Sequence, residues 1–142
     1  MAEHTYHEQV DIDNAAKLRS ILDTLPRFCR DFFRGIEPTT SSRTRIAYAY
    51  DLRVFFEFLF KNNPELKNTP IPSIKIDILD NIQPIDIEEY LDYLSYYVSD
   101  GKEYINKANG KKRKLVSLRS FYSYYYKKQM IKTNPTEFVD VP

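Results

Sequence analysis

Apolar residues recur at steps of three and four along four separate stretches of this chain. That spacing is typical of helices with one buried face. The stretches cover residues 14–34, 39–62, 84–99 and 107–129. Only 3 of the 142 residues are Gly, which disfavours a fold built from many tight turns. The pattern predicts an all-α protein, a bundle of four or five helices.

Breaks between the stretches refine this prediction. Pro26 should kink or split the first helix, because proline removes a backbone hydrogen bond. Asp100-Gly101 should end the third helix, with Val98 in its buried stripe. In residues 63–83, isoleucines alternate with polar residues as in a strand, but no other segment offers a partner strand. We expect an extended segment or a short helical turn there, with its isoleucines in the core.

The two ends of the chain differ from the middle. Residues 1–13 contain four acids, no Lys or Arg and no helical period, so they predict a flexible acidic tail. His4 and His7 lie in this tail without a third ligand, and no metal site is predicted. Residues 14–138 form the expected helical domain. Asn134-Pro135 is a clear break, and residues 139–142 are expected to begin a linker to an absent catalytic domain.

The net charge of +1 hides a strong segregation of charge. Residues 64–100 hold eight acids against two lysines, whereas residues 101–134 hold ten Lys or Arg against one Glu. A nearly neutral protein with such a basic segment has a local electropositive surface, which attracts polyanions. The acidic segment leaves open an alternative, a helical module that binds other proteins.

The basic segment opens with four consecutive cations, Lys111, Lys112, Arg113 and Lys114, at the start of a helix. Cations oppose the positive end of the helix dipole, an arrangement that a bound polyanion makes tolerable. The phase of the apolar stripe turns Ser117 away from the core, on the side of Arg113. A solvated run of charge is the alternative interpretation.

A second helix start has similar chemistry. It carries Ser42, Arg43, Thr44 and Arg45. A simple N-cap would explain one hydroxyl but neither arginine. Hydroxyls and arginines bind phosphates, and arginine also reads guanine edges. Two such starts suggest one shared basic face that binds double-stranded DNA.

The chain also resembles a known family. Residues 41–59, with the pattern Ser-x-x-Thr-x-x-x-Tyr-x-x-Asp-Leu-x-x-Phe-x-x-Phe-Leu, resemble the second helix of the core-binding domain of tyrosine recombinases, the phage integrases and Xer-type resolvases. Residues 82–94 resemble its next helix, and residues 113–142 resemble its last helix and its exit into the linker. The extra leading helix at 18–33 and the insert at 71–82 are most similar to the XerS-like branch.

The resemblance implies a SAM-like helical domain that clamps one face of a recombination site. Its expected partners are DNA, the catalytic domain of the same parent protein and other recombinase protomers. The catalytic domain of this family supplies a tyrosine nucleophile with arginines, a lysine and histidines, and this chain has no His-x-x-Arg. We therefore expect no catalysis by the chain alone and no cofactor.

The remaining expectations concern location and activity. The single cysteine, Cys29, fits a reducing cytoplasm, and the apolar runs are too short and charge-broken to cross a membrane. An independent enzyme has the least support, since paired carboxylates, metal-ligand clusters and Gly-rich phosphate loops are not found. Asp86, Glu89 and Asp92 are better explained as the solvated face of a helix.

Overall fold

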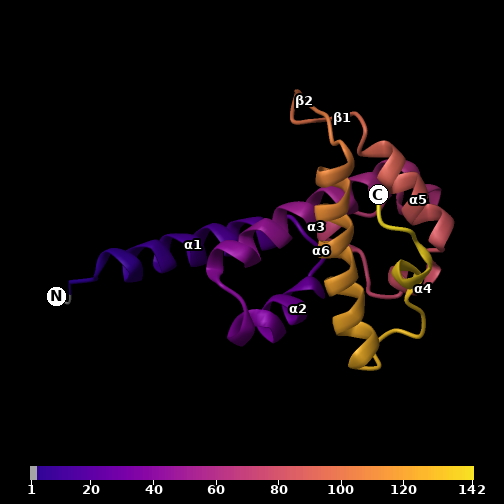
Figure 1. Ribbon diagram of the computed structural model, residues 1–142. Helices are drawn as coiled ribbons and strands as arrows, with labels where there is room; N and C mark the ends of the chain where they lie inside the picture. The colour runs from indigo at the N-terminus through magenta and orange to yellow at the C-terminus, as the bar shows by residue number, and fades with distance from the viewer. Residues whose placement is uncertain (1–2) are drawn as a thin grey trace. The chain divides into compact units, whose positions relative to one another are not determined.

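The computed structural model describes residues 3–142 and is largely helical (Figure 1). The chain divides into two compact units, with the boundary between Ile74 and Lys75. The expectation of a mainly helical protein is confirmed. One short hairpin of β-strands corrects the stricter expectation of an all-α fold.

The first unit is built on three helices, α1 (Tyr6–Leu22), α2 (Cys29–Ile36) and α3 (Ser42–Asn62). Short 3-10 turns at Glu37–Thr39, Pro64–Leu66 and Ile71–Ser73 complete it. Helix α1 packs along α3. The core is rich in phenylalanine, and the rings of Phe32 and Phe33 and those of Phe55 and Phe56 meet edge to face.

The break at Pro26 is confirmed, because it lies between α1 and α2. The start of the chain differs from the expectation. Helix α1 begins at Tyr6, so the irregular tail predicted for residues 1–13 is wrong for residues 6–13, while Met1 and Ala2 lie outside the described residues. Thr5 accepts a hydrogen bond from the backbone N–H of Glu8, and this N-cap starts a helix that the apolar pattern does not reveal.

The second unit contains α4 (Ile78–Asn81), α5 (Pro84–Tyr93), β1 (Tyr97–Ser99), β2 (Lys102–Tyr104) and α6 (Ala108–Lys127). A 3-10 turn at Pro135–Phe138 follows and packs on α5 and α6. The apolar residues predicted for the buried face of α6 are all buried, and they are Leu115, Leu118, Phe121, Tyr122 and Tyr125. Ile78, at the start of α4, is buried as expected.

The third helix is shorter than predicted. It ends at Tyr93, and Val98 lies in a strand with 43% of its surface exposed. Asp100 and Gly101 both have positive φ, 50° and 75°, and they form the turn of the β1–β2 hairpin. Asp-Gly favours a two-residue hairpin turn as well as a helix end, and in this chain it forms the hairpin turn, so the predicted helix end at this position is wrong.

The end of the chain is held by polar contacts within the second unit. One oxygen of Asp80 accepts hydrogen bonds from the backbone N–H groups of Lys132 and Thr133, each at 2.9 Å. Arg119 of α6 donates to the carbonyl of Val139 at 2.6 Å. Val139, placed at the start of the predicted linker, is buried. Packed structure therefore extends one residue beyond the predicted end of the domain.

No helix among residues 3–142 is both long enough and apolar enough to cross a membrane.

Candidate nucleic-acid interface

The loop that leads into α6 is fixed by a small polar cluster. The backbone N–H of Asn106 donates to the carbonyl of Leu94 at 3.0 Å, and the ammonium of Lys114 donates to Oδ1 of Asn106 at 3.0 Å. A Cβ on Gly110 would lie 2.6 Å from that same Oδ1. A side chain at position 110 would therefore push the Asn106 amide away from the first turn of the helix, whereas glycine lets it lie there.

The four cations of this helix start do not share one environment. Lys112 and Arg113 are exposed, and Lys111 is half-buried with its ammonium 2.7 Å from the hydroxyl of Ser95. Lys114 is only 6% exposed and holds Asn106. Lys114 is therefore buried against the loop that it holds, and its role as a DNA contact stays a prediction.

Ser117 also lies elsewhere than expected. It is 2% exposed, and its hydroxyl donates to the carbonyl of Arg113 one turn earlier. The phase prediction failed because the buried face of α6 is wider than the apolar stripe alone. Lys114 stands one turn before Leu118, and Ser117 stands one turn before Phe121, so both fall on that face.

At the start of α3, most polar groups are engaged within the first unit. Ser41 is the N-cap and accepts from the N–H of Thr44 at 3.1 Å. Ser42 donates to Asp11 and accepts from Asn14, both on α1 and both at 3.1 Å. These contacts explain the hydroxyls as elements of packing, and the sequence pattern does not reveal that Asp11 and Asn14 of α1 are the partners of Ser42.

The two arginines of this start differ. Arg45 donates to the backbone carbonyls of Glu37 and Thr40, and so closes the loop between α2 and α3. Arg43 is exposed. The two predicted helix starts belong to different units, so a shared basic face stays a prediction.

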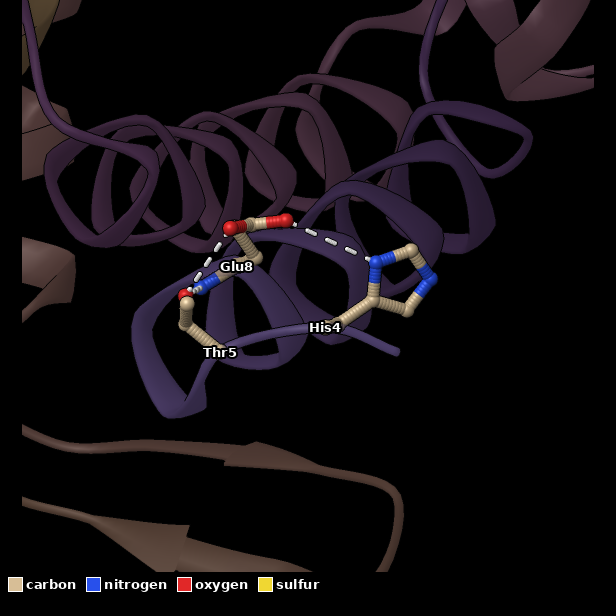
Figure 2. Close-up of polar contacts among 3 residues, drawn as sticks. All are labelled: His4, Thr5 and Glu8. Atoms are coloured by element: carbon tan, nitrogen blue, oxygen red, sulfur yellow. Dashed lines mark hydrogen bonds and ion pairs between the residues drawn. The ribbon is translucent and has the colours of Figure 1, made fainter. Parts of the chain in front are cut away.

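His4 and Tyr122 belong to residue types that act in catalysis, and both make contacts within the fold. His4 lies 3.6 Å from a carboxylate oxygen of Glu8, beside the capping hydroxyl of Thr5 (Figure 2). Tyr122 is buried and donates its hydroxyl to the carbonyl of Leu79 at 2.9 Å. Burial raises the pKa of the Tyr122 phenol far above its usual range, and the carboxylates of Asp80 and Asp86 raise it further. This tyrosine is held as a neutral core residue.

Within residues 3–142, no group of three or more His, Cys, Asp or Glu side chains is placed to hold a metal ion.

These features define a helical protein with exposed cations at the start of a long helix. No family model matches the chain, and no solved structure matches it. Three curated proteins do. One is tyrosine recombinase XerC of Caldanaerobacter subterraneus, which is 39% identical over 107 residues, 72% of this chain and 29% of the relative. Another is tyrosine recombinase XerC of Leptospira interrogans, 31% identical over 123 residues, 87% of this chain and 33% of the relative.

The matches show that this chain is related to the Xer-type tyrosine recombinases over most of its length. The chain spans about a third of the length of the curated relatives that it matches. The relatives are named XerC, and a specific relation to the XerS-like branch stays a prediction.

Proposed function

We propose that this chain is the DNA-binding, SAM-like core-binding domain of a tyrosine recombinase, and that it clamps one face of a recombination site. The observation that carries the proposal is the start of α6. Lys112 and Arg113 are exposed there, Lys111 lies beside them, and the opposite face of the same helix is buried. A rigid helix that presents cations at its N-terminal end is suited to bind phosphates.

Individual roles follow from the position of each side chain. Lys111 and Lys112 are phosphate contacts, since an ammonium acts as a point charge. Arg113 is a candidate for reading a base edge, because its planar fork matches guanine. Arg43 and Thr44 are separate proposed contacts, on α3 of the first unit.

The other four predicted contacts receive supporting roles in this proposal. Ser42, Arg45, Lys114 and Ser117 position the two helix starts through the hydrogen bonds described above.

The matched segments make up 29% and 33% of the two relatives, and the rest of their length guides the proposed partners. We place the remaining part of the parent, including a catalytic domain, on the opposite face of the DNA, with other protomers alongside. The parent acts in the cytoplasm and cuts DNA through its catalytic domain, whereas the present chain alone does not.

DNA binding measured against salt concentration tests the proposal. Half of a clamp lacks the effective concentration that a linked partner gives, so the chain alone should bind weakly. With about five phosphates neutralised, the log–log salt slope should be about −4 to −5. The matched control is Lys127→Ala. It removes an exposed cation at the far end of α6 and should leave binding unchanged. Affinity that does not change between low and high salt would contradict the proposal.

A second assay tests the absence of catalysis. A nicked suicide substrate traps any covalent adduct between a tyrosine and DNA. We expect no adduct with this chain, and an adduct on any of its tyrosines would overturn that part of the proposal.

A helical protein-interaction module is the alternative. Glu88, Glu89 and Asp92 are exposed on α5 and form its acidic side. Under this alternative, charge reversal on α5 would abolish capture of a basic protein partner, and the lysines of α6 would have no effect on DNA.

A further inference from the structure

The β1–β2 hairpin is the feature of the second unit that the proposed function does not explain. Its strands pair antiparallel, with Tyr97 opposite Tyr104 and Ser99 opposite Lys102. A two-stranded hairpin is marginally stable by itself in water. The hairpin is therefore stabilised by contacts with the rest of the second unit, namely a tyrosine stack and hydrogen bonds at its base.

A stack of three tyrosines stiffens the hairpin. The ring of Tyr97 lies 5.2 Å from that of Tyr93 and 5.0 Å from that of Tyr104, with interplanar angles of 21° and 10°. Tyr97 is buried and Tyr93 belongs to α5. The stack therefore joins the hairpin to the end of α5.

Hydrogen bonds place the base of the hairpin at the start of α6. Asn106 follows β2, accepts from Lys114 of α6, and donates its N–H to Leu94 at the end of α5. The Lys111 ammonium donates to Ser95, which precedes β1, at 2.7 Å. In Figure 1 the hairpin extends beyond the N-terminal end of α6. It lies next to the cations proposed to bind DNA.

The hairpin presents apolar surface there. Ile105 is 71% exposed, Tyr104 is 40% exposed, and Val98 is exposed on the opposite side of the ribbon. Between Asp100 and Lys107 the charges cancel, so phosphate attraction does not explain the hairpin. Large exposed apolar side chains on a protruding element indicate a surface that a partner covers.

We propose that the β1–β2 hairpin is a second DNA-contacting element, in which Tyr104 and Ile105 make apolar contacts in a groove beside the phosphates bound by α6. The inference rests on the proposed function. The cations at the hairpin base favour a polyanion over a protein surface as the partner. Two-stranded ribbons fit DNA grooves, where apolar side chains contact thymine methyl groups, sugars or unstacked bases.

The test compares hairpin variants with a charge variant. The probe is a labelled duplex of about three helical turns, enriched by this chain from a random-sequence pool. Ile105→Ser should weaken binding about 5-fold and Tyr104→Ser about 10-fold. Neither should change the salt slope, because neither removes a charge. Lys112→Ala should weaken binding and make the slope shallower by about one unit.

Two controls separate local contact from damage to the fold. Ile85→Ser removes another exposed isoleucine, on α5 of the same unit, and should leave affinity unchanged. Tyr104→Phe keeps the ring and should retain affinity. If Tyr104→Ser alters the circular dichroism spectrum, the Ile105→Ser result decides, since Ile105 lies outside both strands.

The outcomes distinguish this inference from the proposed function. If Lys112→Ala weakens binding while Ile105→Ser and Tyr104→Ser do not, the hairpin inference is overturned and the proposed function stands. If the hairpin variants instead abolish self-association seen by sedimentation, the surface belongs to a second copy of the chain, and the inference is also overturned. If no duplex is enriched, or Lys112→Ala has no effect, the proposed function itself fails.

Discussion

The starts of α3 and α6 both carry clustered cations, but their structures differ. At α3, Ser42 and Arg45 are engaged in hydrogen bonds with α1 and with the preceding loop. At α6, Lys112 and Arg113 are exposed, and it is Lys114 that supports the loop before the helix. The comparison teaches that the composition of a helix start does not decide which cations can reach a ligand. The side chains packed against that start decide it.

The largest expected effect tests whether both starts depend on their cores to the same degree. Leu52 of α3 and Leu118 of α6 are each 1% exposed. Leu52→Ala and Leu118→Ala should each lower the free energy of unfolding by about 2–5 kcal/mol, measured by urea denaturation. If only one substitution is costly, one of the two helices is not positioned by its buried face.

The next effect separates the two arginines of α3. Arg45→Ala leaves backbone carbonyls of the α2–α3 loop without their donor, so it should lower the free energy of unfolding by about 1–3 kcal/mol. Arg43→Ala removes an exposed side chain and should change it by no more than about 0.5 kcal/mol. Equal losses in the same denaturation assay would remove the distinction between them.

DNA binding sharpens the comparison between the two starts. Arg113→Ala should cost about 1–3 kcal/mol of binding free energy and relax base preference at one position. Lys111→Ala should weaken binding to all sequences alike, with a salt slope shallower by about one unit. Arg45→Ala should keep the wild-type slope in fluorescence titrations. A shallower slope for Arg45→Ala would mean that α3 also uses its loop arginine on phosphate.

The smallest effect concerns the buried side of α6. The Tyr122 phenol has a raised pKa in the folded state, so its contribution to stability is fully present below its unfolded pKa of about 10 and declines as the pH rises further. Tyr122→Phe should cost about 0.5–1.5 kcal/mol at neutral pH through the lost hydrogen bond to Leu79. Above pH 10, the stability of the Tyr122→Phe variant should fall less steeply than that of wild type. Parallel curves of stability against pH would contradict the buried environment assigned to Tyr122.

The sequence by itself determined the helical class, the break at Pro26 and the core face of α6. The helical period and the effect of proline are local properties, so both can be recognised from the order of residues in the sequence. The chain also carried enough family pattern to indicate the recombinase relationship that the comparisons then supported.

Tertiary structure decided three further points: the helix at residues 6–13, the hairpin after α5, and the burial of Lys114 and Ser117. The first part of α1 has few apolar residues. Asp11 in this part contacts Ser42, which lies about 30 residues further along the sequence. Asp100-Gly101 is suited to a helix end as well as to a hairpin turn. In the structure it forms the hairpin turn, and Tyr97 of the hairpin stacks on Tyr93 of α5. A polar side chain such as that of Lys114 can be buried when a hydrogen-bond partner such as Asn106 lies beside it. The spacing of residues in the sequence does not reveal that partner.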